Sequence, residues 1–146
     1  MTTPVSKMLG PNSFALMKQQ AQKIVMLTAY DYASGSAVAN SNVDVILVGD
    51  SLGMVVLGYD STLKVTMDDM VSHTAAVRRG APGKFIIADL PYLTYHLSAE
   101  QTKTNAARLI VDGSANAVKL EGGSASRLEA IRQIVDIEIP VCAHLG

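Results

Sequence analysis

Five short apolar runs recur along the chain, and each is apolar at consecutive positions rather than at every second one. A strand covered on both faces needs that pattern, whereas a half-exposed strand alternates apolar and polar residues. Stretches with a helical period separate the runs. Strand and helix in alternation predict a parallel α/β sheet with right-handed crossovers. The expected strands are residues 24–27, 43–48, 85–88, 117–120 and 140–143.

Helix start signals stand between these runs. Thr66 is followed three residues later by Asp69, which predicts a capping box for the helix that contains MVSHTAAVRRG. Ser124 and Ser126 are equal candidates for the cap of the last helix. The other expected helices contain ASGSAVANS, AEQTKTNAARLIVDG and RLEAIRQIV. A further helix is predicted near the N-terminus, over residues 13–22.

The two leading arrangements are a doubly wound sheet and a (β/α)8 barrel. A dinucleotide-binding doubly wound sheet requires G-x-G-x-x-G after its first strand, whereas this chain has TAYDYASG there. The barrel fits better, although a complete one takes about 250 residues. We therefore expect residues 1–146 to form the N-terminal part of a single TIM-barrel domain. Residues 13–22 would form its N-terminal helix, and residues 23–146 would hold barrel strands 1–5.

Composition narrows the function classes. The net charge of −1 gives no reason to expect a nucleic acid or an anionic membrane as a partner. No apolar run approaches the roughly 18 residues that would span a bilayer. The N-terminus lacks the apolar stretch of a secretory signal. Cys142 is the single cysteine, so no intrachain disulfide can form, and a reducing, cytoplasmic setting is expected.

Ionisable side chains follow every expected strand. Because ligands of parallel α/β folds bind at the carboxyl ends of strands, these side chains are candidates for a site. Carboxylates gathered there would raise one another's pKa unless a cation lay among them. Oxygen ligands without a His–Cys cluster favour Mg²⁺. Taken alone, each carboxylate could instead be a helix cap or a surface charge. The residues are Asp31, Asp50, Asp89, Lys119, Glu121 and His144.

Two of these positions leave alternatives open. Lys119 and Glu121 are two residues apart on a strand, so their side chains should face the same side. A lysine facing into a barrel needs an anionic partner, which is either Glu121 or a substrate carboxylate. His144 is either a core histidine bonded to a backbone carbonyl or a residue of the site.

Several long segments resemble the ketopantoate hydroxymethyltransferase family. They are MLTAYDYAS, VGDSLGMVVLGYDSTLKVTMDDMVSHTAAVRRG, ADLPYLTY, AVKLEGG and IPVCAHLG, and the resemblance runs from about Lys23 to the last residue. It implies a (β/α)8 barrel of the phosphoenolpyruvate/pyruvate type that assembles into a homo-oligomer, usually a decamer. The implied reaction transfers a hydroxymethyl group from 5,10-methylenetetrahydrofolate to 3-methyl-2-oxobutanoate, an α-keto acid, and gives 2-dehydropantoate.

The resemblance also implies roles for individual residues. Asp50 and Asp89 match the family's Mg²⁺ ligands, and Glu121 matches an acid placed beside the metal. His144 matches an active-site position. The family's general base, a glutamate, lies beyond residue 146, so we identify no catalytic base here. The positions that match keto-acid contacts are Asp50, Ser51, Asp89 and Lys119.

In the implied mechanism, Mg²⁺ acts as a Lewis acid and stabilises the enolate of the keto acid. Two alternatives remain at this point. One is a different Mg²⁺-dependent α-keto acid lyase on the same barrel. The other is a truncated, catalytically inactive half-barrel that associates with other chains and exposes an apolar edge at residues 140–143.

Overall fold

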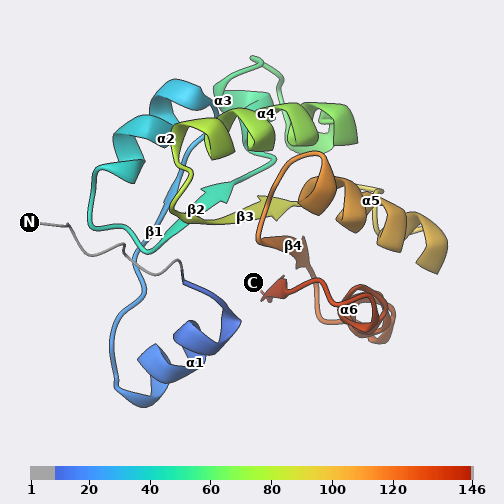
Figure 1. Ribbon diagram of the computed structural model, residues 1–146. Coiled ribbons are helices and arrows are strands. Elements are labelled where there is room, and N and C mark those ends of the chain that lie inside the picture. The colour runs from blue at the N-terminus through green and yellow to red at the C-terminus, as the bar shows by residue number, and fades with distance from the viewer. Residues whose placement is uncertain (1–8, 146) are drawn as a thin grey trace, which may run out of the picture.

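The computed structural model describes residues 9–145, so residues 1–8 and 146 of the expected domain lie outside the described part. Within residues 9–145, five strands are separated by helices, with two of the six α-helices between the second and third strands (Figure 1). The strands are β1 (Met26–Thr28), β2 (Val45–Val48), β3 (Phe85–Asp89), β4 (Ala117–Glu121) and β5 (Val141–His144). The helices are α1 (Pro11–Gln19), α2 (Tyr32–Ala39), α3 (Leu52–Val55), α4 (Met67–Gly80), α5 (Ala99–Val111) and α6 (Ala125–Asp136), with a 3₁₀ turn, η1, at Thr62–Lys64.

The strands form one parallel sheet in the order β1-β2-β3-β4-β5. Each strand therefore pairs with its neighbour in sequence, one β/α unit away. A doubly wound sheet reverses its strand order part-way, and this sheet does not. The expected run of five consecutive barrel strands is confirmed.

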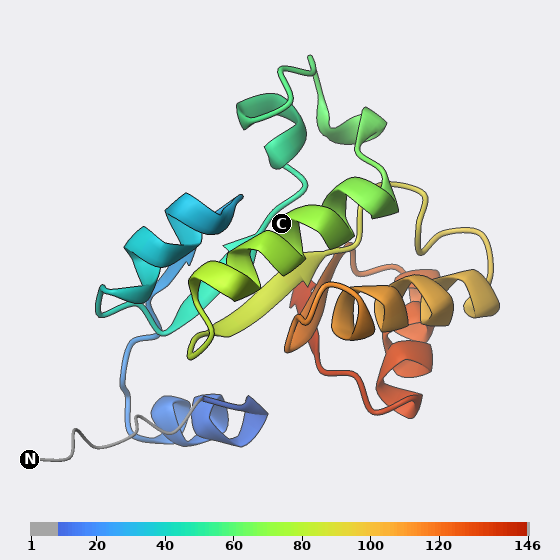
Figure 2. The ribbon, with the colours of Figure 1, turned by 45° about the horizontal axis from the view of Figure 1, so that its top comes forward.

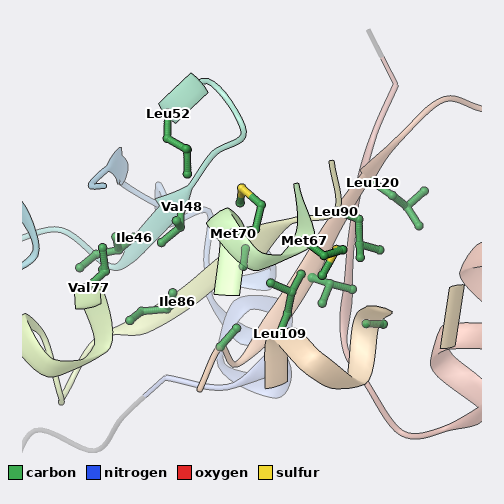
Figure 3. Close-up of a cluster of buried hydrophobic side chains, with 14 of the residues drawn as sticks. Ile46, Val48, Leu52, Met67, Met70, Val77, Ile86, Leu90, Leu109 and Leu120 are labelled. Atoms are coloured by element: carbon green, nitrogen blue, oxygen red, sulfur yellow. The ribbon is translucent and has the colours of Figure 1, made fainter. Parts of the chain in front are cut away.

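Helices α2, α4, α5 and α6 cover one face of the sheet, the outer face, and α1 lies on the other side of it (Figures 1 and 2). Alternate strand residues point to the two faces. The main core lies under the helices, where β2, β3 and β4 contribute side chains such as Ile46, Ile86 and Leu120 (Figure 3). Met70 and Leu109 close this core from α4 and α5.

The inner face carries a second, smaller core made of Val45, Phe85, Ile87 and Ala117. Phe14 of α1 packs edge-on against Phe85, with ring centroids 4.9 Å apart. The predicted N-terminal helix is thus present, but it spans Pro11–Gln19 rather than 13–22, because Pro11 is well suited to the first helical turn.

The expectation that every strand is buried on both faces is wrong for β1. All three of its residues are exposed, and β5 is at most half-buried, because these two strands lie at the edges of the described sheet. In contrast, all five residues of β3 are buried.

The predicted helix caps are largely confirmed. Thr66 and Asp69 form a capping box at the start of α4. Ser124, rather than Ser126, caps α6. No helix in the described residues combines the length and apolarity needed to cross a membrane.

Candidate active site

The carboxyl ends of β2, β3 and β4 bring four charged side chains together, which are Asp50, Asp89, Lys119 and Glu121. Asp89 is the last residue of β3 and lies opposite Lys119 in the strand register. Lys119 donates a hydrogen bond from Nζ to Asp89 Oδ1 at 2.8 Å, and both side chains are largely buried. Asp50 follows β2, and its backbone N–H donates to Asp89 Oδ2 at 3.2 Å. Asp89 is therefore the centre of the cluster.

Glu121 links this cluster to the edge of the sheet. Its carboxylate lies 3.4 Å from Lys119 Nζ and 2.9 Å from His144 Nδ1. Lys119 and Glu121 face the same side of β4, as predicted. The lysine's closer partner is nevertheless Asp89, which comes from the neighbouring strand.

His144 is not a core histidine. Its side chain is half exposed, and it bonds to a carboxylate rather than to a backbone carbonyl. The register places it beside Glu121 at the end of β5. The core alternative is therefore wrong, and a place for His144 in the site stays a prediction.

Asp31, the first of the strand-end acids, lies apart from the cluster and caps a helix. Its Oδ1 accepts hydrogen bonds from the backbone N–H and the hydroxyl of Ser34 at the start of α2. These bonds lower the pKa of Asp31. A helix cap explains this carboxylate without any ligand.

Ser51 is not among the residues that line the small cavity between Asp50, Asp89, Lys119 and Glu121. It has a partner that the sequence did not indicate. The hydroxyl groups of Ser51 and Tyr30 lie 2.9 Å apart. Tyr30 is itself held at both backbone groups: its N–H donates to Ser34 Oγ, and its carbonyl oxygen lies 2.5 Å from His73 Nδ1. A polar residue after β1 was the available signal, although Tyr30 has no obvious reason to face Ser51 until the strands are paired.

The electrostatics of the cluster favour a cation beside the acids. Burial raises the pKa of Asp50, and the charge of Asp89 raises it further. Burial likewise raises the pKa of Asp89, against the opposing charge of Lys119. Burial acts to lower the pKa of Lys119, but the Asp89 and Glu121 carboxylates outweigh it and the pKa is raised. The lysine therefore stays charged beside two acids, of which Asp89 is buried and Asp50 is partly buried.

A small cavity of about 110 Å³ opens between these side chains. Its polar lining is Asp50, Asp89, Lys119 and Glu121, and its remaining walls are Thr62, Leu63, Leu90, Tyr92 and Tyr95. Proteins commonly hold Mg²⁺ through one or two carboxylates, with waters and substrate oxygens at the other positions. Asp50 and Asp89 fit that requirement.

The ligand set of three carboxylates expected from the sequence is not assembled. Within residues 9–145, no three His, Cys, Asp or Glu side chains converge closely enough to hold a metal ion. Glu121 is turned toward Lys119 and His144, and the hydrogen bond from His144 lowers its pKa. Glu121 therefore lines the same cavity as Asp50 and Asp89 without forming a three-carboxylate ligand set with them.

The comparison with known sequences decides the family. Residues 10–146 match the sequence profile of the family described as ketopantoate hydroxymethyltransferase. The chain belongs to the ketopantoate hydroxymethyltransferase family.

Curated relatives in this family carry the name 3-methyl-2-oxobutanoate hydroxymethyltransferase. The one from Listeria monocytogenes is 52% identical over 139 residues, which are 95% of this chain and 50% of the relative. The one from a Thermoanaerobacter species is 55% identical over 129 residues, 88% of this chain and 47% of the relative. This chain spans about half the length of the curated relatives it matches.

Solved structures support the fold. A 2,3-dimethylmalate lyase of the PEP mutase/isocitrate lyase superfamily aligns with a TM-score of 0.70 and 17% identity, covering 90% of this chain and 51% of that one. A phosphonopyruvate hydrolase in complex with oxalate and Mg²⁺ aligns with a TM-score of 0.73 and 11% identity, covering 92% and 52%. The likeness shows the fold, and the described sheet corresponds to about half of each of these longer chains.

Proposed function

We propose that this chain provides the metal- and keto-acid-binding part of an enzyme that transfers a hydroxymethyl group from 5,10-methylenetetrahydrofolate to 3-methyl-2-oxobutanoate. The product would be 2-dehydropantoate, an intermediate of pantothenate biosynthesis. The observation that carries the proposal is the group of Asp50, Asp89 and Lys119 around one small cavity, with Asp89 buried at its centre. Family membership supports the choice of substrates.

Each residue of the cavity has a chemical role in the proposal. Asp50 and Asp89 would hold Mg²⁺, which, when bound, supplies Lewis-acid polarisation that makes the carbon next to a keto group more acidic. Lys119 keeps its positive charge between two acids and can bind the carboxylate of an α-keto acid. The metal-binding pair Asp50 and Asp89 on one side and the Lys119 ammonium on the other would thereby orient a small keto acid.

Two neighbouring groups would support that arrangement. Glu121 is a second carboxylate partner of Lys119, so the ammonium contacts Asp89 and Glu121 together. The hydroxyl of Tyr95 accepts a hydrogen bond from the Glu121 backbone N–H at 3.4 Å, and Arg127 donates to the Tyr95 carbonyl oxygen at 2.7 Å. These bonds tie the end of β4 and the start of α6 to the loop after β3.

The proposed setting is a cytoplasmic homo-oligomer that acts on small molecules. The single cysteine and the family resemblance support the setting and the assembly, respectively. The proton-abstracting base is not assigned to any described residue, so turnover by residues 1–146 alone is not part of the proposal.

Calorimetric titration of the purified chain with 3-methyl-2-oxobutanoate, with and without Mg²⁺, tests the binding half of the proposal. Binding should depend on Mg²⁺, and Asp50→Asn and Asp89→Asn should each weaken it by about tenfold or more, since each removes a charged ligand. Asp60→Asn makes the same change at an exposed aspartate outside the cavity and should leave it unaltered. Mg²⁺-independent binding, or wild-type affinity in both site variants, would contradict the assignment.

A further inference from the structure

A histidine outside the polar cluster is connected to its edge through two contacts in series. His73 lies in the middle of α4 and does not line the small cavity between the acids. Its Nδ1 lies 2.5 Å from the carbonyl oxygen of Tyr30, and the Tyr30 hydroxyl lies 2.9 Å from that of Ser51. The three residues therefore form a chain of contacts that runs from a helix on the outer face to the loop after β2.

The contact with Tyr30 determines which nitrogen of His73 carries a proton. A carbonyl oxygen can only accept a hydrogen bond, so Nδ1 must be the donor. A neutral imidazole has one N–H group, and neutral His73 is therefore the Nδ1–H tautomer. The imidazolium form also donates from Nδ1. His73 can thus hold the Tyr30 carbonyl in either charge state.

Helix α4 is a firm support for this histidine, because it is held at both ends. The capping box of Thr66 and Asp69 fixes its start. Arg78, in its last turn, donates hydrogen bonds to the backbone carbonyl oxygens of Lys84 and Ser114, which belong to two other loops. The middle of the helix therefore has a set position relative to the loop after β1.

The hydroxyl of Ser51 borders the same space as the central carboxylate of the cluster. A Cβ at Gly49 would lie 2.9 Å from Ser51 Oγ and 3.5 Å from Asp89 Oδ2. Because glycine has no side chain, this space is left open to both groups. A ligand held at Asp89 and extending over Gly49 would therefore come within reach of the Ser51 hydroxyl.

We propose that His73 is a positioning residue of this site, an inference that rests on the proposed function. By holding the Tyr30 carbonyl, His73 sets where the Tyr30 hydroxyl lies, and that hydroxyl directs Ser51 toward a keto acid bound beside Asp89. His73 itself touches neither the cavity nor the keto acid. Its whole effect on binding passes through Tyr30.

Calorimetric titration with 3-methyl-2-oxobutanoate in the presence of Mg²⁺ tests this proposal. His73→Ala removes the donor and should weaken binding about threefold or more, within the usual worth of one hydrogen bond. His73→Asn should restore most of the affinity, because its amide N–H can take the place of Nδ1. In a Tyr30→Phe background, His73→Ala should cost nothing further, since the hydroxyl that it positions is already gone.

Val71→Ala separates positioning from a general loss of stability. Val71 is also on α4, where it is partly buried against the main core, and it has no hydrogen bond to Tyr30. This variant should lower the melting temperature and leave keto-acid affinity unchanged. The proposal is overturned if His73→Ala binds like the wild type, if His73→Asn binds as weakly as His73→Ala, if the loss persists without the Tyr30 hydroxyl, or if Val71→Ala weakens binding equally.

Nuclear magnetic resonance tests the same chain of contacts without any keto acid. Nitrogen spectra of the chain with isotope-labelled histidine should show His73 as the Nδ1–H tautomer, and the Nε2–H tautomer would overturn the proposal. Ser51→Ala should shift the signal of the hydroxyl-bearing carbon of Tyr30, and the shift should be much smaller when His73→Ala is already present. Equal shifts would also overturn it. A wild type that binds no keto acid would instead contradict the proposed function, which these spectra do not involve.

Discussion

Single residues in this structure act through partners on other elements of the fold. Tyr30 is the clearest case, because side chains from α2 and α4 hold its backbone N–H and carbonyl while its hydroxyl reaches Ser51. A residue fixed at three points on the rim of a site is well placed to orient what it touches. We infer that Tyr30 positions the Ser51 hydroxyl.

Tyr30→Phe removes that one contact and keeps the ring. Keto-acid affinity in the presence of Mg²⁺ should fall about three- to tenfold, the usual worth of one hydrogen bond. In a Ser51→Ala background the same change should cost nothing more, which a double-mutant cycle by calorimetry would show. Tyr32→Phe, at an exposed tyrosine on α2, is the control. Equal losses in both backgrounds would contradict a role through Ser51.

The pKa of Asp31 predicts an acid-dependent loss of stability. Hydrogen bonds from Ser34 lower the pKa of Asp31 in the folded state. The stability that this carboxylate contributes is therefore fully present above the ordinary aspartate pKa of about 3.9. The contribution is lost as the pH falls through the lower, folded value. Asp31→Asn keeps a capping oxygen without a charge. Lowering the pH from about 5 to 2.5 should therefore lower the melting temperature of the wild type more than that of Asp31→Asn. Thermal unfolding measures both, and melting temperatures that fall in parallel with pH would count against the assignment.

At the scale of elements, α2 and α4 pack together because small residues let their backbones approach. Gly80 ends α4 against α2, and a Cβ placed there would lie 2.8 Å from the backbone nitrogen of Ser36 and closer still to the carbonyl oxygen of Tyr32. Both obstacles are backbone atoms, which cannot rotate away. The contact therefore requires glycine.

Gly80→Ala should lower the free energy of unfolding by about 1–3 kcal/mol, the usual cost of overpacking. Alanine's better helix propensity, at most about 1 kcal/mol, works in the other direction and is outweighed. Gly83→Ala is the matched control, since a Cβ there meets nothing within 4 Å. Urea denaturation of the three proteins measures the difference, and a Gly80→Ala variant as stable as Gly83→Ala would disprove the close contact.

The order and approximate bounds of the elements could be predicted, because consecutive apolar runs and capping residues are local signals. Each of the five strands lies within two residues of its expected start. The partner of Lys119 could not be predicted, since it depends on the register that sets Asp89 opposite it across two strands. The hydrogen bond between Tyr30 and Ser51 could not be predicted for the same reason. Nor could the contact of His73 with the Tyr30 carbonyl oxygen.

The exposure of β1 escaped prediction for a different reason. Its Met26 and Leu27 are apolar like the residues of β2, and whether a strand is buried depends on what lies on either side of it. The sequence predicts what a strand needs, whereas the structure shows which of those needs the described residues satisfy. β1 is an edge strand of the described sheet, so its apolar residues are exposed there.

At the scale of the whole molecule, stability is concentrated in the middle of the sheet. β2, β3 and most of β4 are buried between the two cores, while β1 and β5 are the open edges. Amide hydrogens of β3 should therefore exchange most slowly, and those of β1 and β5 several-fold to many-fold faster through local opening. Mass-spectrometric hydrogen exchange on the isolated chain measures this gradient, and uniform protection across the five strands would contradict it.

The polar cluster also has a consequence for biosynthesis. Asp50 and Asp89 are separated by 39 residues and Asp89 and Lys119 by 30, so all three come from consecutive units of one stretch of chain. At a translation rate of roughly 5–20 residues per second, the whole stretch leaves the ribosome within seconds. All the residues of the cluster are therefore available to one another on the nascent chain as soon as these units have left the ribosome.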